Sequence, residues 1–322
     1  MRRNDELVER LAWHRRERIG NLSERAFDEL RLAVQQQPEN FLDRDDDRAF
    51  SLVCTALAAS RAAQAEEEFL DDEAYESARA KRFARLGAAC REALDVDPNC
   101  LDAKILLAIV STQEADAVLQ ALDTTWEEVG AGDPSGWTKP ETLPGLFARP
   151  RLRLLAARSR YQLDTARYRP AISSCELGVL LDPTDELGLR YTWAVGLARL
   201  EDEAGFDQLD AKFERQGNAW SHLARTLLMY KLDRMGAARR ALRGYASLCT
   251  GGAYALLKPA FVETYLPTRP DFVPGSYEEA TLAVHECDPV VMDTPDFLAW
   301  AGAQEGFTEQ AKCFADDHDL DW

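Results

Sequence analysis

Near its C-terminal end, this sequence holds residue types that could form a catalytic pair or a zinc site. His285-Glu286-Cys287 puts an imidazole base near a thiol, and Cys287, Cys313 and His318 offer the nitrogen and sulfur ligands that zinc accepts. On a helix, however, residues two positions apart point to different faces, and the three zinc-type ligands have no tight paired spacing. We therefore expect no catalytic residue and no metal site in this region.

An acidic run, "DRDDD" at 43–47, is the other stretch that suggests a bound ion. It lacks the glycine and the terminal glutamate of an EF-hand calcium loop. Acidic residues also favour the start of a helix, where they complement the helix dipole. The sequence further contains no nucleophile elbow, no P-loop and no dinucleotide-binding glycine pattern. We expect a solvated loop here, no cofactor and no enzyme activity.

Basic residues gather in one place on an otherwise acidic chain. Seven arginines stand between positions 149 and 169, where there is a single aspartate. Guanidinium groups bind carboxylates through two hydrogen bonds at once, which suits capture of an acidic or C-terminal peptide. The alternative is that these arginines pair with neighbouring Asp and Glu residues and hold helices together.

The composition limits the possible partners. The chain has 322 residues, 46% of them hydrophobic, and a formal charge of −18. A negative chain of this kind is unsuited to general binding of nucleic acid or of an anionic membrane surface. Seven widely spaced cysteines, with no apolar leader and no run long enough to span a bilayer, favour a reduced, cytoplasmic setting.

Helix-forming residues dominate, so the elements that carry these groups should be helices. Apolar periodicity predicts helices over 4–37, 47–67, 72–95, 101–122, 150–164, 168–181, 184–200, 204–215, 218–233 and 235–249. We expect Ser23 to cap a helix, Ser276 to begin one that ends near His285, and further helices over 294–303 and 307–315. The proline-rich stretch before Ser276 should be irregular.

Two segments share one pattern. "FARLGAACREALDVDP" from Phe83 and "YRPAISSCELGVLLDP" from Tyr168 align at an aromatic residue, small residues, a cysteine and a final Asp-Pro. Both resemble the second helix of a tetratricopeptide repeat, and residues 80–302 are similar to bacterial tetratricopeptide-like proteins distantly related to human suppressor-of-tumorigenicity-seven-like proteins. The Gly/Pro-rich stretch 124–148 interrupts the period.

The resemblance implies an all-α fold, a right-handed α-solenoid of helical hairpins that stack on one another. It divides the chain into an N-terminal cap (1–70), tetratricopeptide-like repeats (71–265) and a C-terminal segment with an acidic tail (266–322). In such repeats the first helix of each hairpin lines a concave groove. That register predicts a peptide-binding groove formed by Arg153, Arg160, Tyr161, Arg190 and Tyr191.

The function that follows is a scaffold for protein–protein interaction, which binds an unknown protein or acidic peptide in the Arg-containing groove. Two alternatives stay open. One is an enzyme, or an accessory module of one, with the 124–148 insertion as a lid. The other is self-association, with the groove filled by a second copy or by the acidic, Trp-ended tail.

Overall fold

The structure, a computed structural model, describes residues 3–67, 69–129 and 145–322, and the described chain is all-α, without a β-strand. Most of the predicted 124–148 insertion lies outside the described residues. Contacts divide the helices into two compact units, Met1–Tyr161 and Gln162–Trp322, here called the N-terminal and C-terminal units. None of the described helices combines the length and the apolar character that a bilayer crossing requires.

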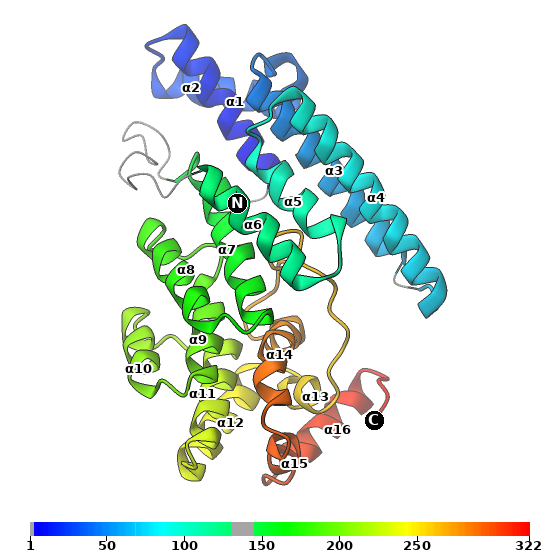
Figure 1. Cartoon of the computed structure of the whole chain (residues 1–322), viewed down its shortest axis with the longest axis vertical. Coiled ribbons are helices and arrows are strands. Elements are labelled where there is room, and N and C mark those ends of the chain that lie inside the picture. Colours follow the sequence, from blue (N-terminus) through cyan, green and yellow to red (C-terminus); the bar gives the residue numbers. More distant parts are fainter. Residues whose placement is uncertain (1–2, 68, 130–144) are drawn as a thin grey trace. The chain divides into compact units, whose positions relative to one another are not determined.

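In the N-terminal unit most helices pack on a helix that is adjacent in the chain. Its longest elements, α3 and α4, lie side by side as an antiparallel hairpin (Figure 1). Helix α5 packs mainly against α4. The unit comprises α1 (Arg3–Ile19), α2 (Glu24–Gln36), the short η1 (Pro38–Phe41), α3 (Asp45–Glu67), α4 (Asp72–Val96), α5 (Leu101–Ser111), α6 (Ala115–Val129) and most of α7 (Arg149–Asp164).

The C-terminal unit begins with hairpins of the same kind and then folds back on itself. After α13, the chain crosses an irregular proline-rich segment (258–276) and returns as α14, which packs against α9 and α11 (Figure 1). Its helices are α8 (Tyr168–Leu181), α9 (Leu189–Arg199), α10 (Glu203–Lys212), α11 (Ala219–Lys231), α12 (Met235–Leu248), α13 (Gly252–Leu257), α14 (Tyr277–Met292), α15 (Phe297–Gly302) and α16 (Phe307–Asp317).

The Asp-Pro pairs end helices as their chemistry predicts. Helix α4 stops at Val96 and α8 at Leu181, immediately before Asp97-Pro98 and Asp182-Pro183. Proline has no backbone N–H to continue the helical ladder. Each aspartate then accepts hydrogen bonds from the turn that follows: Asp97 from Asn99 N at 2.9 Å, and Asp182 from Glu186 N at 2.9 Å.

Close packing between α8 and α9 explains one of the small residues in the repeated pattern. A Cβ atom built on Gly178 would lie 2.9 Å from the side chain of Leu189, too close for an undisturbed contact. Glycine at this position lets Leu189, which is 1% exposed, pack directly against the α8 backbone.

Several predicted boundaries are wrong. The single helix expected over 101–122 is two helices, α5 and α6, separated by a break at 112–114, and the six-residue α13 was not predicted. Helix α14 does not end near His285 but continues past Pro289 to Met292. Val290 and Val291 are buried on its last turns, so apolar burial offsets the backbone hydrogen bond that proline removes.

Candidate functional site

The start of α9 is shaped by Gly188 and Asp185. Gly188 has a left-handed φ of +67°, and a Cβ atom there would lie 2.5 Å from the ring of Tyr191. The buried carboxylate of Asp185 accepts the N–H groups of Leu189 at 2.7 Å and Arg190 at 3.1 Å. Burial raises the pKa of Asp185 to about 6, although these donors and the Arg190 charge favour the ionised form.

Tyr191 belongs to an aromatic stack within the C-terminal unit. Its ring stacks on Trp220 of α11, with centroids 4.3 Å apart and planes 10° from parallel. The guanidinium of Arg269, from the proline-rich segment, lies 5.2 Å from the Tyr191 ring and 5.7 Å from the Trp220 ring. The proline-rich segment therefore contacts the faces of α9 and α11 that carry Tyr191 and Trp220. Tyr191 is one of the predicted groove residues.

Arg269 fixes that segment in place. It donates to the carbonyl oxygens of Leu187 at 3.1 Å and Gly188 at 2.9 Å, to Thr192 Oγ1 at 2.7 Å, and to both oxygens of Glu286 at 2.5 and 2.6 Å. Burial lowers the pKa of Arg269, but the Glu286 carboxylate outweighs burial and raises it. These bonds tie the proline-rich segment both to the start of α9 and to α14.

Arg190 is partly accessible. Its side chain is 25% exposed, lies 4.9 Å from the Phe213 ring centroid and 5.2 Å from that of Tyr191, and donates to Tyr191 Oη at 3.3 Å. Arg190 and Tyr191 are thus brought together by the structure, as the predicted groove requires.

Arg153, Arg160 and Tyr161 lie on α7, in the N-terminal unit. Arg160 and Tyr161 are half-buried, whereas Arg153 is 3% exposed. The Arg153 guanidinium is enclosed by two carboxylates, with bonds of 2.8 and 3.1 Å to Glu6 and of 2.7 and 2.8 Å to Asp102. These internal partners occupy the donors that a peptide carboxylate would need.

The neighbouring arginine Arg158 also binds a helix within its unit. Its Nε donates to Asp123 of α6 at 2.5 Å, and its guanidinium lies 5.7 Å from the Trp126 ring centroid. The alternative interpretation of the arginine-rich stretch, in which guanidiniums hold hairpins together, therefore describes both Arg153 and Arg158.

An open cleft lies over α9, between α8 and α10. It encloses about 430 Å³, and its apolar lining includes Trp193, Leu197 and Ile172. Two cations, Arg169 of α8 and Lys212 of α10, stand at this cleft, and no carboxylate of a described residue pairs with either of them. The other lining residues are Ser173, Glu176, Leu200, Asp202, Gly205, Gln208 and Leu209.

The residues first considered for catalysis or zinc do not form a group among the described residues. Cys287 is fully buried, and burial raises the pKa of its thiol well above the ordinary value, which keeps it protonated. His318 Nδ1 lies 2.9 Å from the carbonyl oxygen of Phe314, and Cys313 is exposed. His14 and the adjacent Asp46 and Asp47 do converge, although the histidine is more than 30 residues earlier in the chain. The solvated loop expected for the acidic run is wrong at Asp47, which lies in the first turn of α3 and is 1% exposed.

The acidic tail packs within its own unit. Tyr254 of α13 donates to the carbonyl oxygen of Asp321 at 3.0 Å, and the Trp322 ring lies 5.7 Å from the ammonium groups of both Lys258 and Lys312. The tail thus contacts α13 and α16, away from Arg190 and Tyr191.

Comparisons with protein-family models, with curated proteins and with solved structures find no match for this chain. Its function must therefore be argued from its own residues and their geometry.

Proposed function

We propose that this protein is a scaffold for protein–protein interaction, built as a tetratricopeptide-like α-solenoid that binds a peptide segment of its partner. The proposal is supported by the repeated aromatic, small-residue and Asp-Pro pattern that ends α4 and α8, and by the stacking of successive hairpins within each unit. The observation that carries it is the cleft over α9, with its tryptophan and its two unpaired cations.

The cleft has the features of a peptide-binding surface. Trp193 and Ile172, which are partly exposed, offer apolar area that would remove a large side chain of the partner from water. Arg169 and Lys212, which no carboxylate of a described residue pairs with, would bind a carboxylate of the same segment; Glu176 and Asp202 also line the cleft, so these two cations, and not a net charge of the cleft, favour an acidic side chain. The expected ligand is a short acidic segment with one large apolar side chain.

Of the residues predicted to form a groove, only Arg190 contributes to the proposed binding surface. Arg269 covers the Tyr191 ring, so a partner that used this face of α9 would have to displace the proline-rich segment. The partly exposed Arg190 lies against Phe213, the residue directly after Lys212, and extends the cationic surface next to the cleft. Arg153 makes no contribution, because its donors are satisfied internally.

Charge reversal at the cleft tests the function. The full chain with Arg169→Glu and Lys212→Glu should lose the partners that the wild type captures from a lysate of its native host, quantified by mass spectrometry. A matched control, Arg240→Glu with Arg243→Glu, makes the same change at exposed positions of α12 and should retain them. Equal recovery of every partner by all three proteins would remove the cleft as the binding site.

The alternative function, an enzyme or accessory module, has one supporting observation. A cavity of about 360 Å³ in the N-terminal unit is lined by Glu128, Val129 and Phe147, which belong to the predicted 124–148 lid, and by Pro150, which follows it. Lys104 Nζ lies 2.6 Å from Glu128 Oε2 at this cavity, but Glu128 is 54% exposed, so water screens this pair. The cleft over α9 supports the scaffold more directly.

A further inference from the structure

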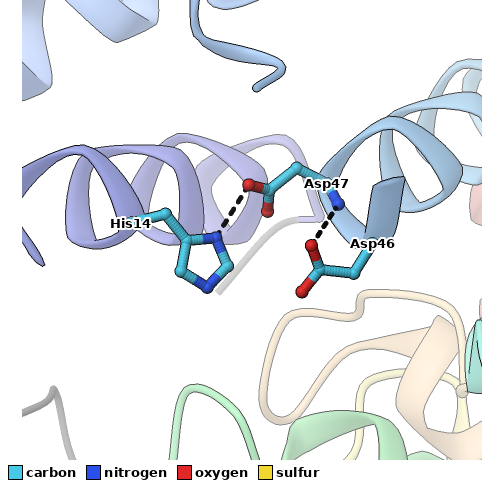
Figure 2. A group of neighbouring side chains, drawn as sticks. All are labelled: His14, Asp46 and Asp47. Carbon is cyan, nitrogen blue, oxygen red and sulfur yellow. Dashed lines mark hydrogen bonds and ion pairs between the residues drawn. The ribbon is translucent and has the colours of Figure 1, made fainter. Parts of the chain in front are cut away.

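The acidic run at the start of α3 meets a histidine of α1. His14 Nδ1 lies 2.7 Å from Asp47 Oδ2, and the ligand atoms of His14, Asp46 and Asp47 all lie within 4.8 Å of one another (Figure 2). The Phe147 ring, 5.3 Å away centroid to centroid, packs against the imidazole and restricts its orientation. One nitrogen and at least two carboxylate oxygens therefore converge from two helices of the N-terminal unit.

The buried carboxylate of Asp47 is the observation that points to a ligand. Asp47 is 1% exposed, yet only its Oδ2 atom is hydrogen-bonded; no described residue donates to Oδ1. Figure 2 shows this second oxygen facing the space between the imidazole ring and the Asp46 carboxylate. A cation in that space would bind this oxygen, to which no described residue donates a hydrogen bond.

Asp46 gives the space an opening and a second negative charge. It borders both the 360 Å³ cavity and a more open one of about 640 Å³, so an ion has a path from solvent. Its present partner is Arg44, with bonds of 2.8 and 3.0 Å.

The competing arginine is easily displaced. The Arg44 side chain is 53% exposed, and an exposed ion pair of this kind contributes little stability. One oxygen of Asp46 also accepts the backbone N–H of Asp47 at 3.1 Å, which holds this carboxylate beside the space. Arg44 can therefore turn towards solvent without loss of the Asp46 position.

We propose that His14, Asp46 and Asp47 bind a divalent transition-metal ion such as Zn²⁺. The Nδ1 lone pair of His14 and one oxygen from each aspartate are the protein ligands, and water completes the coordination. The imidazole then carries its proton on Nε2. A mixed nitrogen and carboxylate set is typical of zinc and related first-row ions, and the bound ion cross-links α1 to the start of α3.

Calorimetric titration of the chelator-treated full chain with Zn²⁺ tests the site. All proteins carry Cys313→Ser, which removes the exposed thiol as a competing ligand. The key variant is His14→Asn, because an asparagine amide can still donate to Asp47 from the position of Nδ1 but is a poor metal ligand. The matched control is His318→Asn, which removes a histidine from the C-terminal unit.

The parent protein should bind one equivalent of Zn²⁺ and gain thermal stability from it. His14→Asn should weaken binding by more than about tenfold, as loss of a direct ligand costs at least as much as loss of an outer-shell partner, and should abolish the thermal shift. His318→Asn should match the parent. Asp46→Asn, at an exposed helix start, should weaken binding too and serves if His14→Asn fails to fold.

Two results would overturn the metal site. One is no Zn²⁺ binding tighter than about 0.1 mM in the parent. The other is equal affinity in the parent and in the folded ligand variants, which would leave the His14–Asp47 pair as a hydrogen bond that only ties α1 to α3. Neither result bears on the cleft over α9, which uses other residues in the C-terminal unit.

Discussion

Replacement of Arg153 by methionine gives the sharpest test of how the N-terminal unit is held together. Arg153 joins Glu6 of α1 to Asp102 of α5 through four hydrogen bonds of 2.7 to 3.1 Å, and all three residues are at most 3% exposed. Methionine retains most of the apolar stem and removes the charge. The variant therefore leaves two buried carboxylates without their shared cation.

Removal of one partner from a buried ion pair costs about 3–5 kcal/mol, because the remaining charge is left uncompensated. Two other ion pairs partly compensate the charges of these carboxylates and lower this cost. Arg3 lies 2.7 Å from Asp102, and Arg10 lies 2.6 Å from Glu6. We therefore expect Arg153→Met to lower the free energy of unfolding by about 3 kcal/mol at pH 7, the lower end of that range.

The loss should depend on pH. Burial raises the pKa values of Glu6 and Asp102, but Arg153 and its neighbours outweigh burial and hold both below their ordinary values of 4.5 and 3.8. In the wild type these carboxylates stabilise the fold above their unfolded pKa values, and that contribution is lost as pH falls through the folded ones. In the variant both pKa values rise, so protonation relieves the buried charge. The difference between the proteins should shrink below about pH 4.5.

Urea unfolding followed by circular dichroism, at pH 7 and pH 4, measures this difference. The control is Arg25→Met, which removes an arginine whose side chain is 91% exposed and whose pair with Glu29 is a surface contact; it should not change stability measurably. A loss for Arg153→Met below about 1 kcal/mol, or one that is the same at both pH values, would refute the assigned role of the cluster.

Two further predictions concern single groups. Because the folded-state pKa of Asp185 is raised from 3.8 to about 6, the folded state holds this proton more tightly than the unfolded chain; the contribution of Asp185 to stability should be fully present below pH 4 and fall by up to about 3 kcal/mol as pH rises through 6. Urea titrations should show this slope, and Asp185→Asn should flatten it. A thiol reagent should label only Cys313 in the native protein and all seven cysteines in urea, since the other six are buried; rapid labelling of a second native thiol would contradict that burial.

Local chemistry explains which parts of the fold the sequence predicts. Ser23 caps α2 by accepting the N–H of Ala26, and Ser276 caps α14 by accepting that of Glu279; both caps were predicted. In a capping box, the glutamate three positions after the serine would accept the N–H of that serine, but Glu279 binds other donors. The Glu279 carboxylate accepts the N–H groups of Gly275 at 2.6 Å and of Ala219 at 2.8 Å, the latter 60 residues away. A pattern of four residues cannot specify such a distant donor.

The candidate sites depend on distant partners in the same way. Repeat register assigns Arg153 to a helix face, but Glu6, 147 residues earlier in the chain, decides that its guanidinium is buried in an ion cluster. His14 and Asp47 are 33 residues apart, so no short spacing motif signals their pairing. The contact of Arg190 with Tyr191 needs no distant partner, because the two residues are adjacent in the sequence and share the start of one helix.

The fold-back of the C-terminal unit limits where a partner can bind. The faces of α9 and α11 already contact α14 and the proline-rich segment. Displacement of that segment would break the buried Arg269–Glu286 pair and the bonds of Arg269 to Gly188 and Thr192, leaving a carboxylate buried without its cation. No comparable contact covers the cleft between α8 and α10, where Arg169 and Lys212 lack carboxylate partners among the described residues. A ligand can enter this cleft without breaking an internal ion pair, which makes it the less costly surface for a partner to occupy.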